Sequence, residues 1–505
     1  TDHTITIPDT DAMTAVDLIT LSEAGGSTED NNVSGDLDVW MHPGTQLNIF
    51  ATDWYWGAEI GAGLLEDRIL DIHSQTDLHM AGITLSGGIS DKDGGCLRMM
   101  HPSGANMDVL ESRFIDCVAL DNGGGAAVSG TVFGLWSTVE DSFATLDGGG
   151  LWVGGDLELL ASNIQGNEAG NDGGGAHVSG NARLYEFSSI ESNRAGENGG
   201  GLWIGGDLYM EQSEVLGNIV TYSGFESPLI GRYGGGVFVS GEQMNTRVEI
   251  LRSTISGNFS GISSAMHIDG GTTPFTLQIT NSTISMNEDR HPMTFAPAVG
   301  WYRLISASGE DEEARPGSVY VVQSTFVCNR NVDEPPKDGF SDPDLSGGFD
   351  LSTNIDLSGD ACDIDKTLGI GYRGAGLPAT PITKTYLSLY EDMLGAPSTS
   401  HGFNAIRSHV PAVTTHSTDA LGSMVSGFGI IAPLAQPRRS MHVHSIVLNT
   451  NLHPAHDLVP CELSLAVDED QVSRGPNPEP RPGTTLLMNE RCDAGAFEIR
   501  SLSNP

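Results

Sequence analysis

The chain has 505 residues, with 66 acidic residues against 24 Lys and Arg, which gives a formal net charge of −42 at pH 7. A surface this negative repels nucleic acids and anionic lipids, so both are excluded as partners. No apolar run reaches the ~18 residues that a membrane-spanning helix requires, so no membrane span is predicted.

The chain begins with an alternating polar and apolar segment, Thr4-Ile5-Thr6-Ile7, which predicts a short strand that Pro8 ends. Residues 9–68 are irregular, apart from an amphipathic stretch at about Asp11–Ser22 that predicts a helix. We interpret residues 1–68 as an N-terminal strand and cap region for the repeats that follow.

The centre of the chain repeats a triple glycine, and each copy is followed by a short strand pattern, a turn and a second strand. An imperfect copy, Gly94-Gly95-Cys96, comes first. The full copies are spaced 25, 25, 26 and 35 residues apart, at Gly123–Gly125, Gly148–Gly150, Gly173–Gly175, Gly199–Gly201 and Gly234–Gly236. The second strand ends with an apolar residue three positions before an Asn, as in Ile164/Asn167, Ile190/Asn193, Val215/Asn218, Ile255/Asn258, Ile284/Asn287 and Phe326/Asn329.

A repeat of this length, with period-two strands and no helix, is too short for a propeller blade and lacks the leucine-rich consensus. It predicts an all-β fold, a single-stranded parallel β-helix in which successive rungs pair at about 4.8 Å. Stacked turns explain the glycines, because a positive φ recurs in every rung. Stacked Asn side chains can form a hydrogen-bonded ladder.

The predicted organisation has four parts. Residues 1–68 form the N-terminal strand and cap region, because the end of a solenoid is a sheet edge that must be covered. Residues 69–330 form the regular rungs, with loops extruded at 219–233 and 288–317. Residues 331–400 are a loop-rich excursion with irregular rungs, and residues 401–505 hold the last rungs and the C-terminal cap.

The six cysteines form three pairs that are close in sequence: Cys96/Cys117, Cys328/Cys362 and Cys461/Cys492. An even count in close pairs favours disulfides and an oxidising compartment, although reduced buried thiols remain the alternative. The sequence starts at Thr1 rather than Met, which predicts a processed chain exported by a cleaved signal peptide. We therefore expect an extracellular or cell-surface location.

The glycine and apolar-x-x-Asn repeats resemble those of polymorphic outer-membrane proteins. The C-terminal region carries further motifs: Pro433-Leu434-Ala435, His444–Leu448, His453–Asp457, Asp470-Gln471, Arg474-Gly475, Arg481-Pro482 and Cys492–Glu498. In these motifs it is more similar to secreted bacterial β-helix proteins with a choice-of-anchor Q domain. That resemblance implies a right-handed parallel β-helix, export and surface residence, but no particular reaction.

Alternation along the strand after each glycine run predicts an outward column of side chains. Neighbours in it lie about 4.8 Å apart, so its rings can stack. Three interpretations remain open: a sugar-binding platform, a protein interface, or a strip covered by the chain's own loops. The column begins at Arg98 and Ala127, and its candidate ligand or interface residues are Trp152, His177, Trp203, Phe238 and His267.

No motif requires a cofactor, but two kinds of metal site remain open. His442, His444, His453 and His456 could converge on a metal, although packing and turn hydrogen bonds are the better explanation. Acidic clusters such as Asp91/Asp93 and Asp468–Asp470 leave calcium open as a ligand, although a solvated surface is the default interpretation. None of them has an EF-hand loop or a Gly-Gly-x-Gly-x-Asp repeat.

The enzymatic interpretation ranks third, because the Gly-His-Gly and Arg-x-Lys motifs of polygalacturonases are absent and no Lys lies between Lys92 and Lys337. The sequence favours a secreted structural β-helix that self-assembles into a filament or matrix, with Thr4, Ile5, Thr6 and Ile7 adding to a neighbour as an edge strand. The alternative is a surface adhesin that binds polysaccharide along the aromatic column. A polysaccharide lyase or hydrolase is the third possibility.

Overall fold

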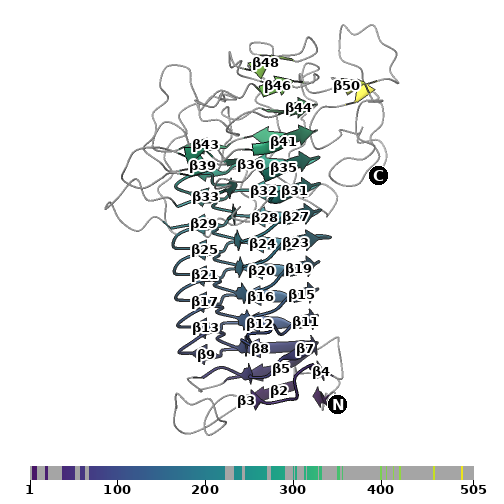
Figure 1. The fold of residues 1–505 in the computed structure, drawn as a ribbon, viewed down its shortest axis with the longest axis vertical. Coiled ribbons are helices and arrows are strands. Elements are labelled where there is room, and N and C mark those ends of the chain that lie inside the picture. The colour runs from purple at the N-terminus through teal and green to yellow at the C-terminus, as the bar shows by residue number, and fades with distance from the viewer. Residues whose placement is uncertain are drawn as a thin grey trace. The chain divides into compact units, whose positions relative to one another are not determined.

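The computed structural model of this chain is all-β and built from stacked parallel strands (Figure 1). The described residues are 3–7, 17–20, 37–51, 57–62, 67–221, 232–240, 245–269, 275–289, 299–300, 302–303, 312–313, 316–322, 324–327, 329–331, 350–352, 355–356, 398–400, 405–406, 413–414, 420–421, 459–460 and 491–492. None of them lies in a helix, and so this part of the chain contains no helix long and apolar enough to cross a bilayer. The prediction of a parallel β-helix is confirmed.

The chain divides into two compact units. The first contains residues 1–208, 218–224 and 232–240, and the second contains 209–217, 225–231 and 241–505. From β7 (Thr76–Ala81) to β26 (Leu202–Ile204) each rung contributes one strand to each of four sheets, which we call A to D. The two rungs before β7 have described strands in sheets A to C. The strands of one sheet lie above one another in Figure 1.

In the first unit the sheets have the following strands. Sheet A contains β1 (His3–Ile7), β4 (Thr45–Ala51), β7 (Thr76–Ala81), β11 (Met107–Leu110), β15 (Val132–Leu135), β19 (Leu157–Leu160) and β23 (Ala182–Tyr185). Sheet B contains β2 (Asp17–Thr20), β5 (Ala58–Gly61), β8 (Ile83–Ser86), β12 (Arg113–Ile115), β16 (Thr138–Glu140), β20 (Asn163–Gln165) and β24 (Ser189–Glu191). Sheet C contains β3 (Leu37–Val39), β6 (Leu70–Ile72), β10 (Leu97–Met99), β14 (Ala126–Val128), β18 (Leu151–Val153), β22 (Ala176–Val178), β26 (Leu202–Ile204) and β30 (Val237–Val239). Sheet D contains β9 (Ile89–Ser90), β13 (Val118–Ala119), β17 (Phe143–Ala144), β21 (Glu168–Ala169), β25 (Arg194–Ala195) and β29 (Ile219–Val220).

The second unit continues the same pattern. Its sheet A contains β27 (Leu208–Glu211, of which Leu208 belongs to the first unit), β31 (Arg247–Leu251), β35 (Phe275–Thr280), β41 (Pro316–Val322), β44 (Asp350–Ser352), β46 (Ser398–Ser400) and β48 (Val413–Thr414). Its sheet B contains β28 (Glu214–Leu216), β32 (Thr254–Ser256), β36 (Thr283–Ser285), β42 (Thr325–Val327), β45 (Ile355–Asp356), β47 (Ala405–Ile406) and β49 (Ala420–Leu421). Sheet C contains β34 (Met266–Ile268) and β38 (Val299–Gly300), and sheet D contains β33 (Phe259–Ser260), β37 (Glu288–Asp289) and β43 (Arg330–Asn331). Two antiparallel pairs join β39 (Tyr302–Arg303) to β40 (Glu312–Glu313) and β50 (Val459–Pro460) to β51 (Arg491–Cys492).

The triple glycines are required by the stacking of the turns. The first glycine has a positive φ, 68° at Gly123 and 67° at Gly148, which side chains with a Cβ rarely adopt. The second has no room, because a Cβ on Gly124 would lie 2.1 Å from the Gly149 carbonyl oxygen of the next rung. Ala at these positions would clash with backbone that the neighbouring rung fixes in place.

The predicted asparagine ladder is present in both units. In the first, Nδ2 of Asn167 donates to Oδ1 of Asn193 at 3.0 Å, and Nδ2 of Asn193 donates to Oδ1 of Asn218 at 3.0 Å. In the second, Asn287 connects Asn258 to Asn329 in the same way. These side chains are almost completely buried, so the ladder satisfies amides that would otherwise be costly inside a core.

A serine ladder, which the sequence analysis missed, follows the turn between sheets A and B. The backbone N–H of each serine donates to Oγ of the serine one rung on, at 3.2 Å from Ser112 to Ser137 and 3.0 Å from Ser137 to Ser162. Ser162 donates to Ser188 in the same way. The spacings of these serines, 25, 25 and 26, equal those of the glycines, so the signal was present in the sequence.

A third ladder of hydrogen bonds, formed by Asn and Asp side chains, precedes the glycine runs. It places the carboxyl groups of Asp147 and Asp172 next to each other. The N–H of Asp172 donates to Oδ1 of Asp147 at 3.2 Å, and Oδ1 of Asp172 accepts from the N–H and Nδ2 of Asn198 at 2.9 and 3.0 Å. Desolvation, helped by the charges of Asp147 and Glu197, raises the pKa of Asp172 to about 6 even though Asn198 opposes the shift. Asp172 therefore titrates close to neutral pH.

Two N-terminal predictions had different outcomes. The strand at Thr4–Ile7 is confirmed, since β1 pairs in parallel with β4. The helix at Asp11–Ser22 is wrong at its C-terminal end, because residues 17–20 form β2, which pairs with β5 in sheet B. An existing sheet edge offers a row of backbone partners, which outweighs a weak helical pattern.

The extruded loops begin later than predicted. Residues 219–220 belong to β29 and residues 288–289 to β37, so both segments continue sheet D before the chain leaves the rung. Most of the first loop and all but a few strands of residues 331–505 lie outside the described residues.

Candidate functional site

The outward column of sheet C is the most distinctive surface feature of the first unit. Its register is continuous, because each member pairs with the next along the sheet. In order, the column reads Asp38, Asp71, Arg98, Ala127, Trp152, His177, Trp203 and Phe238. One end is therefore charged and the other aromatic, with the small Ala127 between them.

The aromatic half is stacked as predicted. The ring centroids of Trp152 and His177 lie 6.3 Å apart, with their planes 5° from parallel. His177 and Trp203 lie 4.1 Å apart at 6°, and Trp203 and Phe238 lie 6.3 Å apart at 18°. Strands one rung apart thus align their rings face to face.

The exposed part of the column is shorter than predicted. Trp152, His177 and Trp203 are half-buried, whereas Phe238 is 7% exposed and packs against Tyr233, with ring centroids 6.3 Å apart. His267, in the second unit, is 1% exposed and its Nδ1 lies 3.2 Å from Oγ of Ser263. Of the three interpretations that the sequence left open, a strip covered by the chain itself therefore fits Phe238 and His267.

Stacking limits what the aromatic residues can bind. A sugar ring needs the face of an aromatic side chain, but both faces of His177 lie against tryptophans. Desolvation lowers the pKa of His177 below its usual value, although the nearby Asp147 carboxylate opposes this shift. The central ring is therefore neutral at pH 7, and the stack presents ring edges to solvent.

The charged half of the column is a buried ion-pair cluster that the sequence analysis missed, apart from Arg98. Oδ2 of Asp71 accepts a hydrogen bond from Arg68 and another from Arg98 at 3.0 Å. Nε2 of His73 lies 2.5 Å from Oδ1 of Asp38 and 3.8 Å from Oδ2 of Asp71. The side chains of Asp38 and Asp71 are only 2% and 1% exposed, so their charges depend on these partners.

This cluster supports an exposed tryptophan. The ring of Trp40 stacks on His73 with centroids 4.2 Å apart and planes 7° from parallel, yet Trp40 is 69% exposed. His73 is held in turn by Asp38. The result is an indole fixed in orientation from below and open to solvent above.

Asp38, Asp71 and His73 bring three potential metal ligands within 4.8 Å of one another. The two guanidinium groups on Asp71 argue against a cation there, because they already balance the two carboxylates. The 2.5 Å contact between His73 and Asp38 is also a hydrogen bond, shorter than two ligands of one metal allow. The predicted cluster of His442, His444, His453 and His456 lies outside the described residues.

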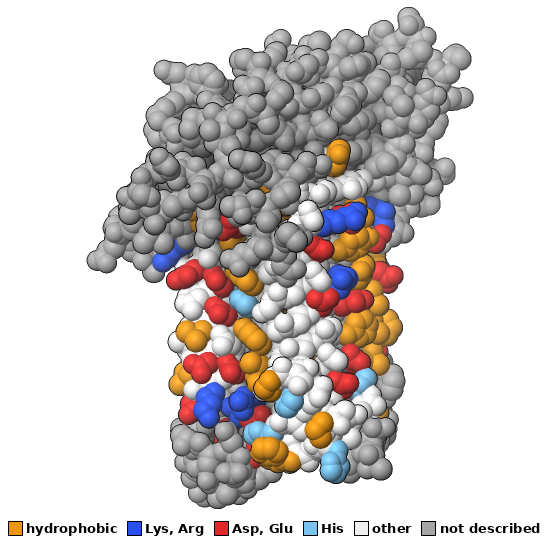
Figure 2. All heavy atoms as spheres, in the orientation of Figure 1, with side chains coloured by type: hydrophobic (Ala, Val, Ile, Leu, Met, Phe, Trp, Pro, Cys, Tyr) orange, Lys and Arg blue, Asp and Glu red, His pale blue; other side chains and the backbone are white. Residues whose placement is uncertain are grey.

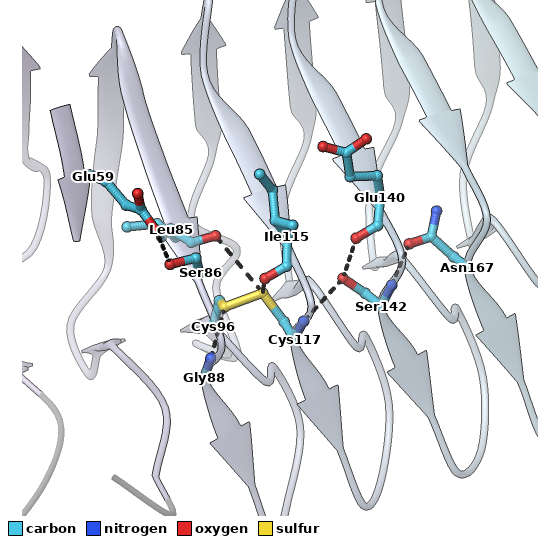
Figure 3. Close-up of a disulfide and its surroundings, with 10 residues drawn as sticks. All are labelled: Glu59, Leu85, Ser86, Gly88, Cys96, Ile115, Cys117, Glu140, Ser142 and Asn167. Carbon is cyan, nitrogen blue, oxygen red and sulfur yellow. Dashed lines mark hydrogen bonds between the residues drawn. A yellow bond between two sulfur atoms is a disulfide. The ribbon is translucent and has the colours of Figure 1, made fainter. Parts of the chain in front are cut away.

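One of the three predicted disulfides is confirmed. Cys96 and Cys117 are bonded, with their Cα atoms 5.4 Å apart (Figure 3). Figure 3 also shows Cys117 at the head of the asparagine ladder, where its N–H donates to Oγ of Ser142 at 3.3 Å. The other two pairs stay predictions, because Cys328, Cys362 and Cys461 lie outside the described residues.

The predicted assembly strand has a partner within the chain. Residues Thr4 to Ile7 of β1 pair with Asn48 to Ala51 of β4 in register. β1 is also the first strand of sheet A, so one of its edges is not paired with any described strand. That edge is where a strand from another molecule could add.

The chain matches no protein-family model, and no curated protein or solved structure is significantly similar to it. The resemblance to secreted β-helix proteins with a choice-of-anchor Q domain therefore stays a prediction. Most of the residues that carry it lie outside the described part of the chain.

Proposed function

We propose that this protein is a structural β-helix outside the cell that assembles end to end into a filament or matrix. The position of β1 carries the proposal, since it starts sheet A and offers one edge that no described strand pairs. A row of free backbone donors and acceptors on a parallel sheet is a template for another parallel strand.

The two ends of the parallel sheets differ, which favours a filament over a closed dimer. Sheet A begins at β1 in the first unit, and it ends at β48 in the second unit. A contact between β1 of one copy and β48 of the next would be heterologous, and such contacts need not close. Its strands would run parallel, as all strands of sheet A do.

An extracellular location is supported by the Cys96–Cys117 disulfide, since such bonds persist in oxidising compartments. The net charge of −42 keeps separate molecules apart at low ionic strength. Salt at ~0.15 M screens charges over about 8 Å, so filaments should form more readily as salt is added.

Electron microscopy of the native protein tests the proposal, first at physiological salt, then with calcium added and with calcium chelated. Regular filaments are expected, and removing residues 1–8 should abolish them while the strand content measured by circular dichroism stays the same. Isolated single molecules under every condition would contradict the proposal.

A matched pair of proline variants sharpens this test. Successive N–H groups of a strand point to opposite edges, so Ile5→Pro and Thr6→Pro remove donors from different edges of β1. The variant that loses the N–H donor on the outer edge of β1 should stop filament growth with an unchanged melting temperature. The variant that loses the donor on the inner edge should weaken the β1–β4 pairing. Filament growth that survives both substitutions would mean that β1 is not the contact.

A glycan-binding surface protein is the second candidate, and the open face of Trp40 is the observation that favours it. Oligomers of N-acetylglucosamine and of galacturonic acid should then quench tryptophan fluorescence. If the exposed indole of Trp40 binds the sugar, Trp40→Ala should remove this quenching. If the aromatic stack binds it, the Trp152→Ala/Trp203→Ala double variant should remove the quenching instead. Trp136→Ala is the control, because Trp136 is 60% exposed at a turn between sheets A and B, away from sheet C. Quenching that persists in all three variants would rule out both sites.

A further inference from the structure

Sheet A carries an outward row of apolar side chains that neither the sequence analysis nor the proposed function used. Leu110, Leu135, Leu160 and Tyr185 are in register on four successive strands, β11, β15, β19 and β23. All four are half-buried, whereas the alternate residues of these strands face the core. We call these four residues the sheet A row.

Large exposed side chains extend this row at the following turn. Trp136 is 60% exposed and comes directly after Leu135, and Phe187, two residues after Tyr185, is 50% exposed. In Figure 2, hydrophobic side chains gather along the edge of the described region where Figure 1 places β11 to β23. A contiguous apolar patch on an otherwise acidic protein marks an interaction surface.

We propose that the sheet A row is the contact between two copies of this chain that lie side by side and antiparallel. The two-fold axis would run along the strand direction, between the rungs of Leu135 and Leu160. Leu135 then faces Leu160 of the second copy, and Leu110 faces its Tyr185. This lateral contact is separate from the end-to-end contact through β1.

The neighbouring outward column of sheet A has opposite charges at its two ends, and the same symmetry brings these ends together. It reads Asp108, Phe133, Glu158 and Arg183, again in register. The axis brings Asp108 of each copy next to Arg183 of the other, so the interface contains two such pairs. These side chains are 48% and 37% exposed, and each already has an ion-pair partner in its own chain: Asp108 lies 3.2 Å from His79, and Arg183 lies 3.0 Å from Asp156. The contact between copies would therefore add a second partner at the exposed side of each pair. Opposite charges at the rim fix the register of an interface more than they add affinity.

The turn residues also fit by size. The antiparallel arrangement brings Trp136 opposite the turn at Ala161, which has a φ of 49° and only a methyl side chain. A large aromatic against a small residue is the kind of packing that interface cores show. At the end of the row Glu111 lies opposite Glu186 of the second copy, and the two carboxylates repel each other. Added salt screens this repulsion, so it should strengthen the dimer.

Sedimentation in ~0.15 M and ~0.5 M sodium chloride tests for the dimer, with the full chain carrying the β1 proline substitution that stops end-to-end growth. We expect a monomer–dimer equilibrium that shifts toward dimer as salt increases. Leu160→Glu and Trp136→Ala should each weaken the dimer at least tenfold. Leu120→Glu is the matched control, because Leu120 is 52% exposed beside sheet D and should leave the equilibrium unchanged. A monomer at both salt concentrations would overturn the proposal.

Cysteine cross-linking tests the direction of the pairing. Leu110 and Tyr185 are three rungs apart, or about 14 Å along the stack. A mixture of the Leu110→Cys and Tyr185→Cys variants should therefore form a disulfide-linked heterodimer, whereas neither variant alone should cross-link beyond the wild-type background. Self-cross-linking of Leu110→Cys would indicate parallel copies and overturn the antiparallel arrangement. If Leu160→Glu does not weaken the dimer, the contact lies on another face of the protein and the proposal is wrong.

Discussion

Cys96 and Cys117 occupy the positions at which other rungs place a glycine and a ladder asparagine. Cys96 is in register with Gly125 and Gly150, and Cys117 with Ser142 and Asn167. A Cβ on Gly150 would lie 3.0 Å from Cγ of Asn167, so the asparagine takes the space of a side chain there. The disulfide and the glycine–asparagine pair therefore fill equivalent packing sites in different rungs.

This relationship predicts how the disulfide can be replaced. Cys117→Ala should lower the free energy of unfolding by about 3 kcal/mol, because a bridge across 21 residues is lost and a cavity remains. Cys96→Gly/Cys117→Asn should recover a large part of that loss by extending the ladder to Ser142. Chemical denaturation with and without a reductant measures both effects. A double variant no more stable than Cys117→Ala would contradict the equivalence of the two sites.

Asp172 should make the protein less stable as the pH rises from about 4 to about 6. Its pKa is raised from 3.8 to about 6 in the folded chain, so the native state binds more protons than the unfolded state within that window. Asp172→Asn should remove this decline and stabilise the protein at pH 7.5 by about 1–2 kcal/mol, while changing little near pH 4. Asn already stands at the equivalent positions Asn122 and Asn198.

The measurement is chemical denaturation of both proteins across pH 4 to 8. Asp116→Asn serves as the control, because Asp116 is an exposed acid of the same unit. Equal pH profiles for the wild type and Asp172→Asn would contradict the expectation.

His177 should have the opposite dependence on pH. Its pKa is lowered in the folded chain, so the unfolded state binds more protons between that lowered value and 6.5, and stability is lost as the pH falls through this range. Protonation should also change the fluorescence of Trp152 and Trp203, which stack on both faces of the ring. His177→Phe should keep the stack and abolish the acid transition. A fluorescence titration that is the same in both proteins would show that His177 does not cause it.

The repeat was predictable because its signals are local. The glycines and ladder asparagines mark each rung, and alternation from Gly150 correctly placed Trp152 in an outward column. Alternation alone could not decide between an exposed column and a covered one, because it says nothing of what lies over an outward side chain; Phe238 and His267 are buried. The charged cluster was missed for a different reason. β3 and β6 follow no triple glycine, so nothing in the sequence aligns Asp38 and Asp71 with Arg98.

That cluster yields a last prediction, in which Arg98 stabilises the column from its charged end. Arg98→Ala would leave Asp71, whose side chain is 1% exposed, with Arg68 as its ion-pair partner, and should lower the free energy of unfolding by about 2–3 kcal/mol. Arg113→Ala is the control: Arg113 pairs with Glu140 at the surface, where its side chain is 52% exposed, so the loss should stay below about 1 kcal/mol.

Denaturation of both variants distinguishes a buried ion pair from a surface one. Fluorescence of Trp40 gives a second readout, since a less constrained Asp71 should also loosen His73 beneath the indole. Equal losses in the two variants would mean that water reaches Asp71 and screens its charge. The charged end of the column would then provide much less rigid support for Trp40 than its burial indicates.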